Sequence, residues 1–302
     1  MKSIIENLFH QAQSMGTGRL SAGFMDLTTG ETVYLNGDTP NPTASVYKIF
    51  VLCQLFYMQK ERQLSFCHKH TLLEEEKSIG SGVLEKAEAG TEYTLMDYVM
   101  LMMTISDNTA TDYLVKLAGK ENIRKNILER FGLQGSKLDM DCMEILTAYY
   151  NTTLEEYRDR CKSGCWYDSH MGSYFLCQEE KNNQTTAKDM VRLLSLLNQG
   201  QVIDPDSDRQ MLDIMAQCKT NARIPALLPD SVRVEHKTGS IDHLANDVGI
   251  VRTHKGDYIL ALFYNGNIGS REEYISTSFK EVGNQILSKL SYDIYNAFIM
   301  NK

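Results

Sequence analysis

Three short motifs contain the residue types that could carry out chemistry: S-V-Y-K at 45–48, S-D-N at 106–108 and K-T-G at 237–239. A serine hydroxyl is a weak nucleophile until a neighbouring base takes its proton. Lys48 lies one helical turn after Ser45 and can act as that base only when it is neutral. Burial and a second cation lower a lysine pKa, and Lys237 is the obvious second cation. The spacing therefore predicts Ser45 as nucleophile and Lys48 as base.

The Ser-x-x-Lys pair alone is weak, because such a pair occurs about once by chance in a chain of this length. The ordered trio, however, resembles the motifs of class A β-lactamases and penicillin-binding proteins. The stretches around the motifs resemble the same family: "GFMDLTTGETVYLNGDTPNPTASVYK", "TLMDYVMLMMTISDNTATDYLVKLAG", "NNQTTAKDMVRLL" and "HKTGSIDHLANDVGIV". The "GSGVL" at 80–84 fits the broader β-lactamase-like serine hydrolases better than the classical enzymes.

The resemblance implies roles for further residues. Ser106 would relay a proton toward the leaving group, and Asn108 would bind the substrate amide. Lys237 would hold a substrate carboxylate by charge, and Thr238 would hold it by a hydrogen bond.

The resemblance also implies an oxyanion hole and a further cation. The backbone N–H groups of Ser45 and Ser240 would form the oxyanion hole, where the loss of one donor costs about 2.7–4 kcal/mol of barrier. Arg223 has an offset from Lys237 similar to that of the carboxylate-binding arginine of some class A enzymes. An ordinary surface arginine is an equally good interpretation.

The sequence departs from the family at the omega loop, where class A enzymes carry the glutamate that activates the deacylating water. Aligning "SKLDMDCMEIL" with the family pattern puts Cys142 at the glutamate position and Leu146 at that of its partner asparagine. Asp141 comes one residue before, and Glu144 comes two residues after. Glu144 remains a candidate base, because loop alignments are uncertain by a residue or two. Without a carboxylate, acylation could proceed while hydrolysis of the acyl-enzyme slows.

A segment at about 145–183 is inserted beside the omega-loop position and is expected to rim or cover the site. It contains four potential zinc ligands, but their spacing matches no zinc template, which favours plain buried thiols; they are Cys161, Cys165, His170 and Cys177. We therefore expect no metal and no cofactor. His236 and His243 have no assigned role, and a surface position is the favoured interpretation of His243.

Strand-like patterns at both ends of the chain, with helices between them, predict an α+β fold, and the resemblance implies that this fold is β-lactamase-like. We expect one antiparallel five-stranded sheet flanked by terminal helices, plus an all-helical lobe, in a single domain over 1–302. The sheet lobe would comprise about 1–43 and 223–302, and the helical lobe about 44–222. The last helix is expected to begin near Ser270, with a capping box that Glu273 completes.

The formal net charge of −8 and the lack of a long basic run argue against nucleic acid or an anionic membrane as a partner. The longest apolar run, "IFVLCQLFYM", is too short to span a bilayer. We see no export signal, and seven scattered cysteines favour a cytoplasmic protein with reduced thiols. An exported protein whose signal had been removed would look the same. The sequence carries no signal for an oligomeric state.

Three functions fit these observations. The leading hypothesis is a serine hydrolase that forms an acyl-enzyme on Ser45 and hydrolyses a small-molecule β-lactam or related amide. The second is a D,D-peptidase-like or esterase-like hydrolase with little lactam turnover. The third is a ligand sensor that is acylated without turnover, which sustained multiple turnover would exclude.

Overall fold

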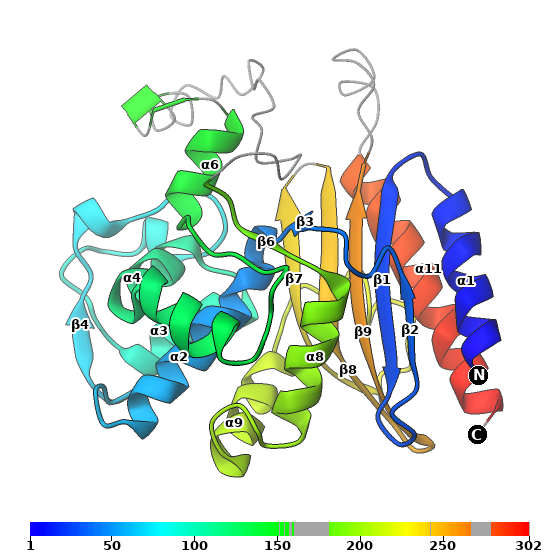
Figure 1. The fold of residues 1–302 in the computed structure, drawn as a ribbon. Coiled ribbons are helices and arrows are strands. Elements are labelled where there is room, and N and C mark those ends of the chain that lie inside the picture. Colours follow the sequence, from blue (N-terminus) through cyan, green and yellow to red (C-terminus); the bar gives the residue numbers. More distant parts are fainter. Residues whose placement is uncertain are drawn as a thin grey trace.

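The computed structural model describes residues 1–150, 152–153, 155–156, 159, 181–241, 243–266 and 279–301. A five-stranded sheet lies at its centre in the order β2-β1-β9-β8-β7, with every neighbouring pair antiparallel (Figure 1). The strands are β1 Arg19–Asp26, β2 Thr32–Leu35, β7 Arg233–Ile241, β8 Leu244–Thr253 and β9 Gly256–Asn265. The predicted α+β class and antiparallel five-stranded sheet are confirmed.

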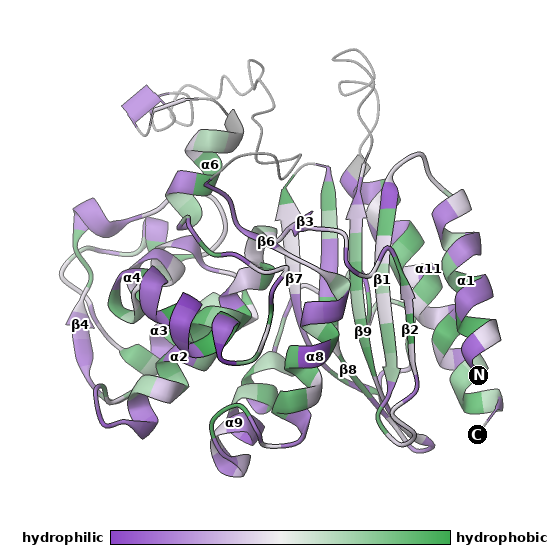
Figure 2. Ribbon diagram, in the orientation of Figure 1, coloured by the Kyte–Doolittle hydropathy of each residue, from purple (hydrophilic) through white to green (hydrophobic). Residues whose placement is uncertain are grey.

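The two faces of the sheet pack into separate hydrophobic clusters, because successive strand residues point to opposite faces. On β9, Ile259 and Ala261 belong to one cluster, whereas Leu260 and Leu262 belong to the other. The terminal helices α1 (Lys2–Ser14) and α11 (Phe279–Met300) pack together and cover one face. Helix α8 (Ala187–Asn198) packs on β1 and β9 from the opposite side (Figure 1). Hydrophobic residues accordingly follow the central strands in Figure 2.

The remaining helices gather beside the β7 edge of the sheet (Figure 1). Apolar residues surround α2, which is buried from its first residue to Phe56 and forms the centre of this helical region. A capping box of Thr94 and Asp97 begins α3, and Met102 and Met103 of that helix are fully buried. The helices of this region are α2 Lys48–Lys60, α3 Leu95–Thr104, α4 Asn108–Ala118, α5 Lys120–Ile123, α6 Cys142–Tyr150 and α9 Pro205–Met215.

Short elements connect these parts. Two-stranded pairings join β3 (Asn41–Pro42) to β6 (Gln184–Thr185), and β4 (Lys69–Thr71) to β5 (Glu92–Thr94). The 3₁₀ turns are η1 Ala44–Tyr47, η2 Glu74–Glu76 and η3 Leu84–Lys86, and η4 (Arg124–Glu129) is a π-helical turn.

Two expectations stay predictions. The division into two lobes with the stated boundaries is one of them. The other is the expected start of the last helix, since Ser270 and Glu273 lie outside the described residues; α11 is described from Phe279. No helix within the described part of the chain is long and apolar enough to cross a membrane.

Candidate active site

Ser45 lies in the 3₁₀ turn η1, which leads directly into α2. The sequence predicted a helix from Ser45 onward; a tighter turn forms there instead. Ala44, the residue before it, has a φ of 43°, in the left-handed region that costs a non-glycine residue roughly 1–2 kcal/mol. Asn246 on β8 holds this turn, because its side-chain amide donates to the carbonyls of Pro42 (2.9 Å) and Thr43 (3.2 Å). The nucleophile candidate is therefore placed on a strained turn that the sheet supports.

A cavity of about 320 Å³ lies in front of Ser45. Residues from η1, from the loop between η2 and η3, from the start of α4, from α6 and from the end of β7 surround it: Ala44, Ser45, Tyr47, Gly80, Ser81, Asn108, Cys142, Ile145, Leu146, Ser240 and Ile241. Of the sequence-predicted site residues, the structure thus brings Ser45, Asn108 and Ser240 to one cavity.

Lys48 is fully buried, and its Nζ is surrounded by acceptors from the S-D-N motif. It donates to the Ser106 carbonyl (2.9 Å), to Ser106 Oγ (3.0 Å) and to Asn108 Oδ1 (3.2 Å). Three acceptors use all three N–H bonds of an ammonium group. A neutral Lys48 must give up one of these contacts, and its lone pair then becomes available to take a proton.

Lys237, on β7, approaches the same serine hydroxyl. Its Nζ donates to Ser106 Oγ (3.2 Å) and to the Thr238 carbonyl (2.8 Å). Ser106 itself has a φ of 61°, the second strained non-glycine residue at this site. The S-D-N serine is therefore the point at which the two predicted lysines meet.

Burial favours the neutral forms of both lysines, and the charge of Lys48 adds to this effect at Lys237. Burial lowers the pKa of Lys48, although the nearby Cys142 and Asp112 oppose that shift. Burial and then the charge of Lys48 lower the pKa of Lys237 to about 7. The sequence predicts that Lys237 lowers the pKa of Lys48. In the structure, the charge of Lys48 contributes to lowering the pKa of Lys237.

The K-T-G glycine allows β7 to pass close to the turn of the nucleophile. A Cβ atom on Gly239 would lie 2.4 Å from the Thr43 carbonyl oxygen and 3.1 Å from the Ser45 nitrogen. Since the first contact is with backbone, a larger residue would push β7 away from Ser45.

We expect Gly239→Ala to reduce acylation of Ser45 by about 100-fold, since a displacement near 1 Å has that effect. It should also lower the free energy of unfolding by about 1–3 kcal/mol. Gly30→Ala is the matched control, because Gly30 (φ 75°) lies at an exposed turn with nothing near its missing Cβ. It should lose stability but keep its acylation rate. Equal acylation rates in the two variants would contradict this role of Gly239.

The central residue of S-D-N, which the sequence analysis left without a role, organises the loop beside the cavity. Asp107 caps α4 by accepting from Ala110 N (2.9 Å), and it also accepts from Val83 N (2.6 Å) and Leu84 N (2.9 Å). The N-cap position of an aspartate before a helix was the available sequence signal. Asn108 is held nearby, because its Nδ2 donates to the Ile79 carbonyl (3.0 Å).

The structure corrects the surface interpretation of Arg223. Its side chain is 1% exposed, so the surface interpretation is wrong. Its guanidinium donates to protein acceptors behind the K-T-G strand: Asn284 Oδ1 (2.8 Å), the Gly239 carbonyl (3.0 Å), the Asn246 carbonyl (2.6 Å) and Ser240 Oγ (2.5 Å). Arg223 therefore positions β7 and the Ser240 hydroxyl, and it is not among the residues that line the cavity; its role in carboxylate binding stays a prediction.

Arg223→Met should lower the free energy of unfolding by about 2–4 kcal/mol, because it leaves buried carbonyls without donors. A positioning residue should affect acylation by a carboxylate-bearing reagent and by a neutral ester to a similar extent. Arg209→Met, at an exposed arginine, should change stability by no more than about 0.5 kcal/mol. A selective loss for the carboxylate-bearing reagent would instead favour direct binding.

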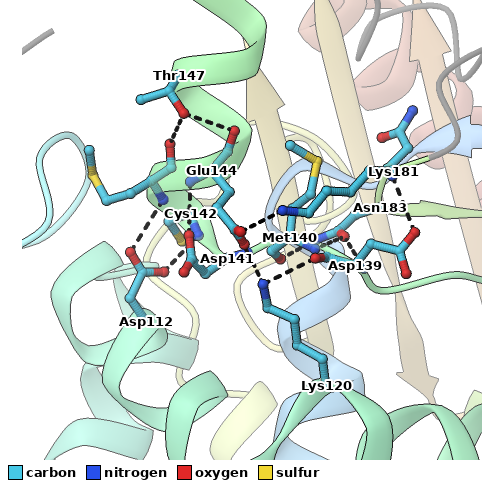
Figure 3. Close-up of polar contacts among 12 residues, drawn as sticks. Asp112, Lys120, Asp139, Met140, Asp141, Cys142, Glu144, Thr147, Lys181 and Asn183 are labelled. Carbon is cyan, nitrogen blue, oxygen red and sulfur yellow. Dashed lines mark hydrogen bonds and ion pairs between the residues drawn. The ribbon is translucent and has the colours of Figure 1, made fainter. Parts of the chain in front are cut away.

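The candidate base Glu144 is a second correction. It lies in the first turn of α6, where it forms ion pairs with Lys120 and with Lys181 (2.6 Å), and it accepts from Asp141 N (2.9 Å) (Figure 3). Burial alone would raise the pKa of Glu144, but the two lysines hold it at about 2. Glu144 does not line the cavity of Ser45. It is therefore neither placed nor tuned to activate a water molecule there.

Cys142 lies where the alignment expects the missing glutamate. It is buried, it lines the cavity, and its Sγ is 3.1 Å from the hydroxyl of Tyr47. Asp112 on α4 accepts from Cys142 N (2.6 Å) and from Ser78 Oγ (2.6 Å), so it caps the start of α6 (Figure 3). Burial, then Asp112, raises the pKa of the Cys142 thiol. No aspartate or glutamate is among the described residues that line this cavity.

Leu146 stands where the family has the partner asparagine, and Asn183, from a distant part of the chain, takes its place. Leu146 lines the cavity, whereas Asn183 accepts from Asp139 N (2.8 Å) and Met140 N (2.9 Å) and donates to the Met140 carbonyl (2.8 Å). The Asn183 carbonyl also accepts from Thr43 N (3.1 Å). Asn183 thus connects the omega-loop position to the turn of Ser45, which the sequence analysis did not find.

The candidate zinc ligands and the two histidines without an assigned role remain. No group of three or more His, Cys, Asp or Glu residues in the described part could hold a metal ion. The zinc candidates Cys161, Cys165, His170 and Cys177 lie outside that part. His243 is 2% exposed, so its expected surface position is wrong; His236 is 1% exposed.

Comparisons with known proteins agree with this geometry. The fold is similar to that of a β-lactamase from Sphaerobacter thermophilus DSM 20745 (24% identity, TM-score 0.79, 99% of this chain and 98% of that chain). It is also similar to PBP-A (22% identity, TM-score 0.75, 97% of this chain and 96% of that chain). A mutant of PBP-A in an acyl-enzyme complex with penicillin G has 21% identity, a TM-score of 0.76 and coverage of 99% and 97%. No curated protein matched the sequence.

The fold and the three motifs define a serine hydrolase of the class A β-lactamase type. The model of the Beta-lactamase enzyme family matches residues 1–298, so the chain belongs to that family.

Proposed function

We propose that this hydrolase forms an acyl-enzyme on Ser45 with a β-lactam or a related small amide, and that it releases the acyl group slowly. The observation that carries the proposal is the convergence of Lys48 and Lys237 on Ser106 beside a cavity that contains Ser45 but no described carboxylate. The acyl-enzyme that a PBP-A mutant forms with penicillin G supports the choice of substrate class.

In the acylation step, neutral Lys48 takes the proton of Ser45 Oγ as that oxygen attacks the substrate carbonyl. The N–H groups of Ser45 and Ser240 stabilise the oxyanion, and the close passage of Gly239 keeps these two residues together. The C–N bond then breaks, and Ser106 passes the proton from Lys48 to the leaving nitrogen. Protonated Lys237, with Thr238, holds a substrate carboxylate.

Deacylation needs a base for the attacking water molecule, and Cys142 is a poor one. Its thiol is largely protonated because burial raises its pKa, and it already contacts Tyr47. The acyl group should therefore persist on Ser45 long enough to be detected.

Intact-mass measurement after mixing with benzylpenicillin tests the acylation step. We expect a stoichiometric adduct that maps to Ser45, followed by slow recovery of the free mass. An absence of any adduct, with both benzylpenicillin and an activated ester on folded protein, would overturn the proposal.

The lack of a good deacylation base at Cys142 also favours a second candidate, a D,D-peptidase-like or esterase-like hydrolase with little lactam turnover. Steady-state turnover of nitrocefin and of a simple thioester or ester separates the two. Faster turnover of the ester, with nitrocefin limited to about one equivalent, would select the second candidate. Turnover of neither substrate after acylation would select an acylated sensor.

The pKa of Lys237 predicts a pH dependence that differs between anionic and neutral reagents. Lys237 is charged below a pH of about 7 and loses its charge as the pH rises through that value. The ratio of acylation rate constants, carboxylate-bearing penicillin to neutral ester, should therefore fall above pH 7 by up to about tenfold per unit. Both reactions need neutral Lys48, so the ratio of their rate constants cancels the opposite pH dependence that Lys48 causes. A ratio that stays constant from pH 6 to pH 9 would contradict carboxylate binding by charged Lys237.

A further inference from the structure

The lining of the cavity in front of Ser45 divides into polar and apolar residues. Its polar side chains, from three different elements, are those of Ser45, Ser81, Asn108 and Ser240. The rest of the lining is largely apolar and comprises Ala44, Tyr47, Gly80, Cys142, Ile145, Leu146 and Ile241. No charged side chain occurs among the described residues that surround this cavity. The cavity therefore favours a substrate part that is uncharged and largely apolar.

One face of α6 supplies most of the apolar surface. Cys142, Ile145 and Leu146 are three and four residues apart on this helix, so their side chains lie on the same face. Glu144, in the same turn, pairs with Lys181 and is not part of the cavity lining (Figure 3). Positions 142 and 146 are those at which the family resemblance places the water-activating glutamate and its asparagine. In this chain, the place of that polar pair is therefore an apolar surface.

The polar atoms of this surface have partners within the protein. The hydroxyl of Tyr47 and the Sγ of Cys142 are 3.1 Å apart and hydrogen-bond to each other. A buried water molecule makes about three hydrogen bonds, and the side chains of Ile145 and Leu146 offer none. An apolar group that fills the space beside them gains the free energy of hydrophobic burial instead.

Gly80 shows how close this surface lies to the reacting bond. A Cβ atom on Gly80 would lie 2.9 Å from Asn108 Nδ2 and 3.7 Å from Leu146 Cδ1. The side chain of Leu146 therefore lies beside the amide that is expected to bind the substrate. The Oδ1 atom of Asn108 accepts from Lys48 (3.2 Å), the proposed base. The part of a substrate that is attached directly to its reacting carbonyl is thus the part that reaches Leu146.

We propose that Leu146, together with Cys142 and Ile145, forms an apolar subsite for the side chain of the substrate's acyl group. Leu146 determines the specificity of this subsite, because it presents a branched alkyl group where the resemblance places an amide. The substrate class is an amide or ester whose acyl group carries an uncharged alkyl or aryl side chain. This inference rests on the proposed acylation of Ser45.

A series of esters with one neutral leaving group tests the subsite. The rate constant for acylation of Ser45 is measured with the p-nitrophenyl esters of acetic, butanoic and methoxyacetic acid. Each is divided by the rate constant with imidazole, which corrects for intrinsic reactivity. The corrected value should rise about fourfold for each buried methylene, about 15-fold from acetyl to butanoyl. Methoxyacetyl, with an ether oxygen in place of one methylene, should lose most of this gain. Equal corrected values for the three esters would overturn the proposal.

Variants of Leu146 assign the selectivity to this residue. Leu146→Asn should reduce the butanoyl-to-acetyl ratio by about tenfold, whereas Leu146→Met, of similar volume and polarity, should keep it. Leu227→Asn is the matched control, because Leu227 is 52% exposed and does not line the cavity. A purely structural effect would slow all esters to the same extent and leave the ratio unchanged. An unchanged ratio in Leu146→Asn would therefore refute the role of Leu146.

A second variant keeps the test decisive if Leu146→Asn does not fold. Leu146→Ala enlarges the subsite, so the hexanoyl ester should gain relative to the butanoyl ester; no gain would count against the subsite.

Two further outcomes would also overturn the inference. A second series keeps the acetyl group and lengthens the alcohol part of the ester. A rate that follows the alcohol part alone would place the occupant on the leaving-group side of the bond. If the proposed function itself fails, no ester acylates Ser45 in any variant, and both proposals fall. If only the inference fails, the adduct on Ser45 forms at a rate that does not depend on the acyl chain.

Discussion

Replacement of Ser45 by alanine is expected to abolish the covalent penicillin adduct and to reduce hydrolytic turnover by about 10⁴-fold or more. The physical reason is that acyl transfer through a serine needs its oxygen, and no other described hydroxyl shares its position on the strained turn before α2. Intact-mass measurement after mixing with benzylpenicillin, and turnover of an activated ester, check the result.

Ser81→Ala is the matched control, because Ser81 lines the same cavity from the opposite loop. It should keep the adduct and most of the turnover. The melting temperature of both variants should stay close to that of the unmodified protein. A penicillin adduct of full stoichiometry on Ser45→Ala would show that the nucleophile has been assigned to the wrong residue.

Replacement of Cys142 by glutamate is expected to accelerate deacylation by about 100-fold, the lower range of general-base catalysis. The side chain at 142 lines the cavity of Ser45, and the charge of Lys48 is close enough to stabilise a carboxylate there. The buried carboxyl group of Asp112 opposes ionisation of a glutamate at 142. Burial, then Asp141, raises the pKa of Asp112 to about 6, and a second carboxylate nearby would raise it further. The gain should therefore increase with rising pH, as the new carboxylate ionises.

Cys142→Gln controls for size without a base. Release of the penicilloyl group, followed by the return of the free mass over time, should accelerate in the glutamate variant alone. Equal deacylation rates in the glutamate and glutamine variants would mean that the side chain at 142 does not reach the attacking water.

Much of the fold could be read from local patterns. The strand-like patterns at both ends of the chain indicated the sheet, and the helical patterns between and beside them indicated the helices that flank it. Both signals depend on residues close together in the chain, which is why they can be recognised without a structure. The turn of Ser45 was less predictable, because its 3₁₀ form depends on Asn246, about two hundred residues away.

The sequence by itself determined the residue types of the site. Acyl transfer by this chemistry needs a serine, lysines that can lose a proton and a glycine where backbone passes close, and S-V-Y-K, S-D-N and K-T-G supply them in order. Cys142 at the place of a glutamate was equally visible, because the departure is one of residue type.

Only the tertiary structure decided what each charged side chain faces. Glu144 faces Lys120 and Lys181, Arg223 holds the back of β7, and the imidazole of His236 contacts Asp247. These partners come from separate elements, and their distance and burial set each pKa. The role of an ionisable residue therefore depends on its surroundings in the folded chain, which neither residue type nor spacing contains.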